Sequence, residues 1–183
     1  VLEKWDDFFR DFRGDTIHPS TMRNLEELGL YKEFMKLPVS KTEQVAFFYQ
    51  DQKYVLGDFS YLKSVPPFIG FIPQWDFLNF LSTHAKKYHG FNLRMGTKAK
   101  DLIKENGKVV GVKAKDKNEA IEIYANLVVG ADGRKSVIRQ KAGLKVVDLG
   151  SPIDVLWFKL SKKDRKEDET SGHVDSGNFM ILL

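Results

Sequence analysis

The sequence has no cysteine among its 183 residues. Their absence excludes a disulfide framework and any metal site built on thiolates. The sequence also lacks a run of about 18 consecutive apolar residues, the length that a membrane-spanning helix requires. A charged, aromatic stretch follows residues 1–4, where a signal peptide would carry an apolar segment. We therefore expect a protein of the reducing cytoplasm that has no membrane span.

The charge is nearly balanced, with 29 Lys and Arg against 25 Asp and Glu and a net charge of +4. Basic residues are spread along the chain among acidic ones, so we expect no nucleic-acid partner. Hydrophobic residues make up 42% of the chain and charged residues 30%, a composition typical of a folded domain. The four histidines are scattered, which argues against a metal site; they are His18, His84, His89 and His173.

The order of the expected elements indicates an α/β nucleotide-binding domain. Apolar spacing predicts helices, which cover residues 19–28, 31–36, 74–88 and 135–142. A hairpin is expected over 45–59, and an antiparallel meander over 98–124 with an Asn-Gly turn. Other short strands are expected at 1–4, 91–95, 127–129, 155–160 and 178–183. Residues 4–16 and 64–73 are expected to be irregular, and 162–171 a charged connection.

The most informative motif covers residues 128–139, where an apolar strand leads through small residues into a helix. In an open α/β sheet, ligands bind at the carboxyl end of such strands. Asp132 supplies an acceptor there for ribose hydroxyls or loop amides, and Gly133 permits a positive φ in the turn. Ser136 can cap the helix, and Arg139 can reach back to acidic or carbonyl groups.

This motif resembles the fingerprint D-G-x-x-S-x-x-R of the flavoprotein aromatic hydroxylases, the para-hydroxybenzoate hydroxylase-like family. All four fixed positions match, as Asp132, Gly133, Ser136 and Arg139. The resemblance implies that Asp132 and Gly133 lie on the flavin side, near the FAD ribose. It assigns Arg139 a mainly structural role.

Three further segments resemble cofactor contacts of the same family. Residues 1–4, with Glu3 and Lys4, resemble the strand end where an acidic residue binds the hydroxyls of the adenosine ribose. Arg13 matches an arginine beside the FAD phosphates, and Gln74 a Gln or Arg beside the ribityl and phosphate groups. Each also has a plainer interpretation: a surface carboxylate, an exposed arginine before a helix, and an ordinary helix start.

The resemblance implies an α/β fold with a Rossmann-like FAD-binding domain over residues 1–150, interrupted by the antiparallel meander. That domain would lack its first βα unit, and the family's Gly-rich loop and later Gly-Asp motif fall outside the chain. Residues 151–183 would begin a mixed or antiparallel substrate-binding sheet, so we expect a chain incomplete at both ends. Residues 38–72, which are rich in aromatic side chains, are a candidate contribution to the substrate side.

The function implied by the resemblance is that of an FAD-dependent monooxygenase with NAD(P)H as co-substrate. It would hydroxylate an aromatic or other lipophilic small molecule with O₂ through a flavin C4a-hydroperoxide. The cofactor carries this chemistry, so the sequence needs no catalytic base and we assign none. A flavin-dependent reductase or halogenase of the same fold and a non-catalytic nucleotide-binding module are the alternatives.

Overall fold

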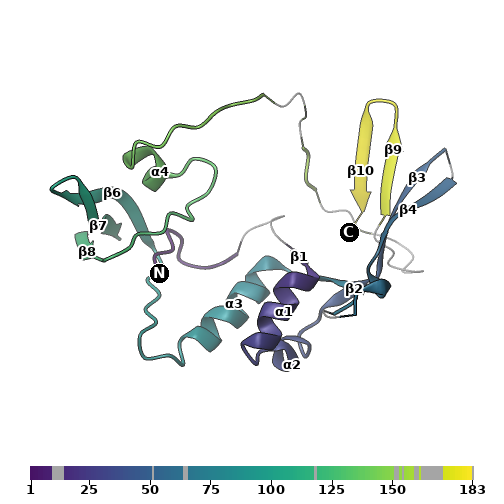
Figure 1. Cartoon of the computed structure of the whole chain (residues 1–183), viewed down its shortest axis with the longest axis horizontal. Helices are drawn as coiled ribbons and strands as arrows, with labels where there is room; N and C mark the ends of the chain where they lie inside the picture. Colours follow the sequence, from purple (N-terminus) through teal and green to yellow (C-terminus); the bar gives the residue numbers. More distant parts are fainter. Residues whose placement is uncertain are drawn as a thin grey trace. The chain divides into compact units, whose positions relative to one another are not determined.

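A computed structural model describes residues 1–9, 15–50, 52–63, 66–117, 119–150, 153, 155–158, 161 and 171–182. The chain forms two compact units. The first consists of residues 1–8 and 81–155, and the second of residues 9–80 and 156–183. Figure 1 shows the helices and strands of both units. The mixed α/β class expected from the sequence is confirmed.

The helices of the second unit pack through aromatic and aliphatic side chains. Helix α1 (Pro19–Glu27) begins with Pro19 at its first turn, and α2 (Tyr31–Phe34) follows after Gly29. Buried side chains of α1 lie three residues apart, at Met22 and Leu25. The buried Phe34 ring contacts Phe77 and Phe80 of α3 (Gln74–Ala85), at centroid distances of 5.7 and 5.9 Å. All three helices were expected from the sequence, with slightly longer bounds.

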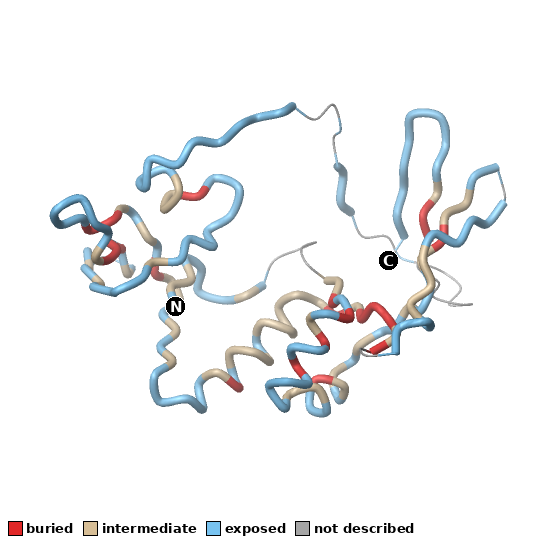
Figure 2. The backbone as a smooth tube through the Cα atoms, viewed as in Figure 1, coloured by how far each residue is buried: buried red, intermediate tan, exposed pale blue. Residues whose placement is uncertain are grey.

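A small antiparallel sheet lies beside these helices, in the order β1-β5-β2. Its strands are β1 (Thr16–Ile17), β2 (Ser40–Thr42) and β5 (Ile69–Phe71). The prediction of irregular structure over 4–16 was therefore wrong at Thr16, and that over 64–73 was wrong at Ile69–Phe71. The reason is that β1 and β2 both pair with β5 across large sequence separations. Buried residues cluster here and along α1, as Figure 2 shows.

The second sheet of this unit has four strands, in the order β10-β9-β3-β4. The expected hairpin is confirmed as β3 (Gln44–Tyr49) and β4 (Gln52–Asp58), followed by the short 3-10 helix η1 (Phe59–Tyr61). A second hairpin, β9 (Ser171–Asp175) and β10 (Asn178–Leu182), joins it through parallel pairing of β9 with β3. The strand at β10 was expected, whereas β9 was not.

The first unit contains the expected meander, β6-β7-β8, with antiparallel pairing throughout. Its strands are β6 (Thr97–Glu105), β7 (Lys108–Asp116) and β8 (Glu119–Tyr124). Asn106 and Gly107 form the tight turn, and both have a positive φ, 49° and 79°. Residues Leu102, Ile103, Val112 and Ala114 form its buried core.

The expected strand at 127–129 is not formed. Leu127 and Val129 are each 77% exposed, and no described strand pairs with this segment. Residues 155–158 of the other expected strand are likewise unpaired and exposed, while residues 159 and 160 lie outside the described residues. Both predictions were wrong because an apolar run becomes a strand only beside a partner that accepts its backbone hydrogen bonds.

Candidate functional site

The loop before helix α4 (Val137–Lys141) is organised around the carboxylate of Asp132. The Ser136 hydroxyl donates a hydrogen bond to Asp132 Oδ1. The backbone amides of Val137 and Ile138 donate to Oδ2 at 2.6 and 3.2 Å. Ser136 Oγ in turn accepts from the Arg139 amide at 3.0 Å, so Ser136 caps the helix as predicted. Asp132 therefore binds the donors that the first turn of a helix leaves unpaired.

These contacts set the charge of Asp132. Partial burial acts to raise the pKa of its carboxyl group, but the hydrogen bonds from Ser136, Ile138 and Val137 outweigh this effect and lower the pKa. The group is therefore a carboxylate at neutral pH. Its negative charge lies at the N-terminus of α4, where the helix dipole favours it.

The other residues of the motif hold the loop close to helix α4. A side chain at Gly130 would place its Cβ 2.8 Å from Ile138 Cγ2, so only glycine fits beside the helix. Gly133 has a φ of 87°, as the turn requires. The Arg139 guanidinium donates to the Arg134 carbonyl at 2.5 Å, which confirms that Arg139 reaches back to a carbonyl group.

Glu3 and Lys4 follow a short parallel pairing at the chain's first residues. Leu2 pairs with Arg94, the Glu3 amide donates to the Arg94 carbonyl at 2.9 Å, and the Thr97 amide donates to the Glu3 carbonyl at 2.8 Å. The Glu3 side chain accepts from the Trp5 amide at 3.0 Å. Lys4 places its ammonium group 5.1 Å from the centre of the Trp5 ring. The segment thus puts a carboxylate directly after an isolated parallel bridge.

Gln74 is the first residue of α3, and its backbone is held by Asp15. The Gln74 amide donates to Asp15 Oδ1 at 3.1 Å, and the Ile72 amide donates to the Asp15 carbonyl at 2.9 Å. Sequence reasoning missed this role of Asp15, because the two partners lie 59 residues apart. Arg13, the remaining predicted contact, lies outside the described residues.

The predicted residues are divided between the two units. Glu3, Lys4, Asp132 and Gly133 belong to the first unit, and Gln74 belongs to the second. Within the described parts of the chain, no group of three or more His, Cys, Asp or Glu side chains could hold a metal ion. Among these described residues, no helix is long and apolar enough to cross a membrane.

A family model described as an FAD binding domain matches residues 1–182. The chain is 27% identical over 163 residues to the 6-methylpretetramide 4-monooxygenase of Streptomyces rimosus, covering 88% of this chain and 39% of the relative. It is 33% identical over 111 residues to the digeranylgeranylglycerophospholipid reductase of Thermoplasma acidophilum, covering 59% of this chain and 28% of the relative. The chain thus spans about two fifths or less of these relatives.

A solved structure with a similar fold is the FAD-dependent chondrochloren halogenase of a myxobacterium. It superposes with a TM-score of 0.67 at 18% sequence identity, covering 76% of this chain and 32% of the halogenase. At this identity the similarity shows the fold alone.

Proposed function

The chain belongs to the FAD-binding domain family, and from this premise we propose that the whole protein is an FAD-dependent monooxygenase. The match of the family over residues 1–182 is the observation that carries the proposal. A relative named as a monooxygenase, similar over 88% of the chain, supports the reaction class. NAD(P)H is the proposed electron donor, and O₂ the proposed source of the inserted oxygen.

The residues of the first unit fit a dinucleotide cofactor. Glu3 places its carboxylate after the parallel pairing of Leu2 with Arg94, and a carboxylate in this position suits the two hydroxyls of a ribose. Lys4, beside it, adds a positive charge for the phosphates. In the second unit, the Asp15 contact orients the backbone of Gln74 at the start of α3. We propose that Glu3, Lys4 and Gln74 contact FAD, together with Arg13, which lies outside the described residues.

We propose that Asp132 acts on FAD chiefly by shaping the loop. Its carboxylate is occupied by Ser136 and two backbone amides, so it fixes the path of residues 130–136. Gly130 then leaves room for Ile138 of α4, and Gly133 gives the turn its positive φ, so that the loop keeps one shape beside the cofactor. When bound, FAD supplies the redox and oxygen chemistry, and the protein contributes binding, orientation and exclusion of water.

The four-stranded sheet of the second unit is the proposed substrate side, since it joins residues of the 38–72 region to residues after 151. The His173 ring stacks on Phe48 at a centroid distance of 5.2 Å, and its Nε2 lies 3.3 Å from Ser171 Oγ. On the other face, Phe47 covers Gly172 and contacts Phe179 at 5.2 Å. An imidazole stacked on an aromatic ring suits an aromatic or other lipophilic substrate on this face.

A reductase is the second candidate. It is favoured by the 33% identity to a digeranylgeranylglycerophospholipid reductase, a higher identity than that to the monooxygenase but over a shorter part of the chain. A reductase of this kind would add two hydrogens to the substrate and would need no O₂. The halogenase alternative rests on the fold alone.

The test is an oxygen-isotope experiment on the whole protein with FAD, NAD(P)H and separate panels of polycyclic aromatic and isoprenoid-lipid substrates. For a monooxygenase, substrate, O₂, NAD(P)H and a proton give the hydroxylated product, water and NAD(P)⁺. We expect one oxygen atom from labelled O₂ in the product, and equal consumption of NAD(P)H and O₂. Gain of two hydrogens without O₂ would instead establish the reductase, and a dependence on halide the halogenase.

The substrate side is tested in the same assay by His173→Ala, with His89→Ala as the matched control. His89 is an exposed residue of the other unit. We expect His173→Ala to raise KM for the accepted substrate by roughly three- to ten-fold, because the imidazole provides the polar contact on this face. Equal KM values in the two variants would remove His173 from the substrate site.

A further inference from the structure

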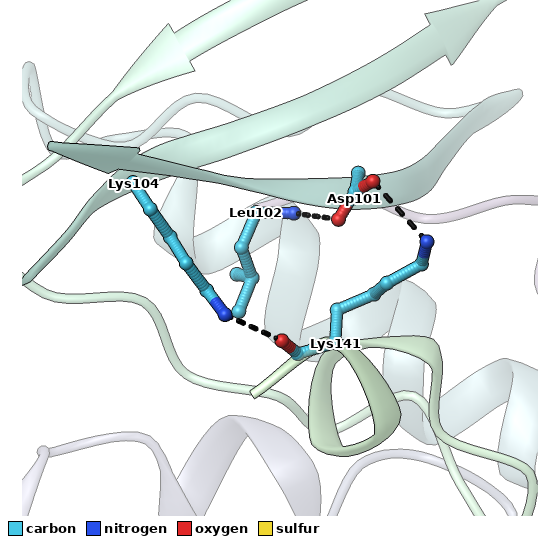
Figure 3. A network of polar contacts seen from close by, with 4 residues as sticks. All are labelled: Asp101, Leu102, Lys104 and Lys141. Carbon is cyan, nitrogen blue, oxygen red and sulfur yellow. Dashed lines mark hydrogen bonds and ion pairs between the residues drawn. The ribbon is translucent and has the colours of Figure 1, made fainter. Parts of the chain in front are cut away.

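Three charged residues connect the meander to the short helix α4 in the first unit (Figure 3). Lys104 Nζ donates to the carbonyl oxygen of Lys141 at 2.8 Å. Lys141 Nζ in turn reaches Asp101 Oδ2 at 3.2 Å. Asp101 is itself held by a hydrogen bond of 2.8 Å from the Leu102 amide to its Oδ1. We name Asp101, Lys104 and Lys141 the β6–α4 clasp.

The geometry of β6 is adapted to the clasp. Residues three apart on a regular strand point to opposite faces, yet Asp101 and Lys104 both contact Lys141. The pairing of β6 with β7 is irregular at both residues, between Ala99 and Asp101 and between Ile103 and Lys104. Such irregularities increase the local twist and redirect side chains, and they are frequent beside functional sites.

Helix α4 depends on contacts at both of its ends. It has five residues, too few to be stable without tertiary contacts. Asp132 and Ser136 bind the amides of its first turn, and Lys104 binds the carbonyl of its last residue. The helix dipole is stabilised by a negative charge at its N-terminus and by a positive charge at its C-terminus, and α4 has a carboxylate at the first end and an ammonium group at the second. Movement of the C-terminal contact would therefore be transmitted to the Asp132 loop.

We propose that the β6–α4 clasp positions α4, and through it the Asp132 loop, for binding FAD. Lys104 and Asp101 are thus positioning residues, which act on the cofactor through residues 130–141. The cofactor part of this inference rests on the proposed function. The positioning of α4 rests on the contacts alone, so the two parts can be tested separately.

The experiment compares Lys104→Met, which removes the donor, with Lys104→Arg, which keeps one, in the whole protein. Glu122→Gln is the matched control, because it breaks another exposed ion pair of the meander, between Lys113 and Glu122 at 3.2 Å. Amide hydrogen exchange over residues 130–142, the dissociation constant of FAD, the visible flavin spectrum and Tm are measured for each variant. We expect Lys104→Met to exchange faster in this segment and to bind FAD roughly three- to ten-fold more weakly.

Lys104→Arg should restore both properties, and Tm should match that of Glu122→Gln, since an exposed contact contributes little to global stability. Equal hydrogen exchange and equal FAD affinity in Lys104→Met and Glu122→Gln would overturn the inference. Faster exchange with unchanged FAD affinity would overturn its cofactor part. If the unmodified protein binds no FAD, the proposed function fails, and the exchange of residues 130–142 still decides whether the clasp positions α4.

Discussion

The carboxylate of Asp132 accepts hydrogen bonds from one hydroxyl and two backbone amides, and this arrangement explains why an aspartate suits the position. An asparagine has the same shape, but it offers only one acceptor oxygen and no charge. The hydrogen bonds also lower the pKa of Asp132 against the opposing effect of partial burial. The ionised residue therefore stabilises the loop more than the protonated residue does.

We predict that Asp132→Asn lowers the free energy of unfolding by about 0.5–1 kcal/mol at neutral pH, a modest value because the residue is only slightly buried and mostly exposed to solvent. Because the folded-state pKa is lowered, the stabilisation is present above the ordinary value of 3.8 and is lost as the pH falls through the folded-state pKa. Denaturant unfolding in steps down to about pH 2 should show the two proteins converging.

Asp148→Asn is the control for this prediction, since Asp148 accepts one amide hydrogen bond within the described residues, from Gly150 at 3.0 Å. Equal losses in the two variants, or a difference that persists at low pH, would show that the ionised carboxylate does not hold the loop.

At the scale of the elements, turns and helix limits that depend on a few neighbouring residues were predicted correctly. The Asn106–Gly107 turn predicted the β6–β7 hairpin, and Pro19 and Gly29 marked the limits of α1. Pairings between distant segments could not be predicted, such as β3 with β9. The apolar run at 127–129 was misread for the same reason, because its sequence does not contain the partner that a strand requires.

We predict that Gly107→Ala destabilises the meander by about 1 kcal/mol, because the turn imposes a φ of 79° and the backbone of an alanine is strained at this angle. Gly57→Ala in β4 is the control: its φ is not in the positive range, and an added Cβ meets no atom within 4 Å. Thermal unfolding and hydrogen exchange of the β6–β7 amides measure the effect. A loss no larger for Gly107→Ala than for Gly57→Ala would contradict the importance of the turn.

At the scale of the whole molecule, the candidate cofactor residues are distributed along the chain from Glu3 to Gly133 and over both units. The motif at residues 132–139 indicated the family, because four fixed positions coincide within eight residues. The contacts of Asp101 and Lys104 with α4, and of Asp15 with Gln74, could not be predicted, because all three residues resemble ordinary surface charges in the sequence. Their partners are known only once the chain is folded.

The central claim is that the protein binds FAD, and the absorption spectrum of the purified whole protein tests it most directly. We predict the two bands of an oxidised flavin, one in the near ultraviolet and one in the blue, and release of FAD on denaturation. A colourless protein that takes up no added FAD would contradict the account and favour a non-catalytic nucleotide-binding module.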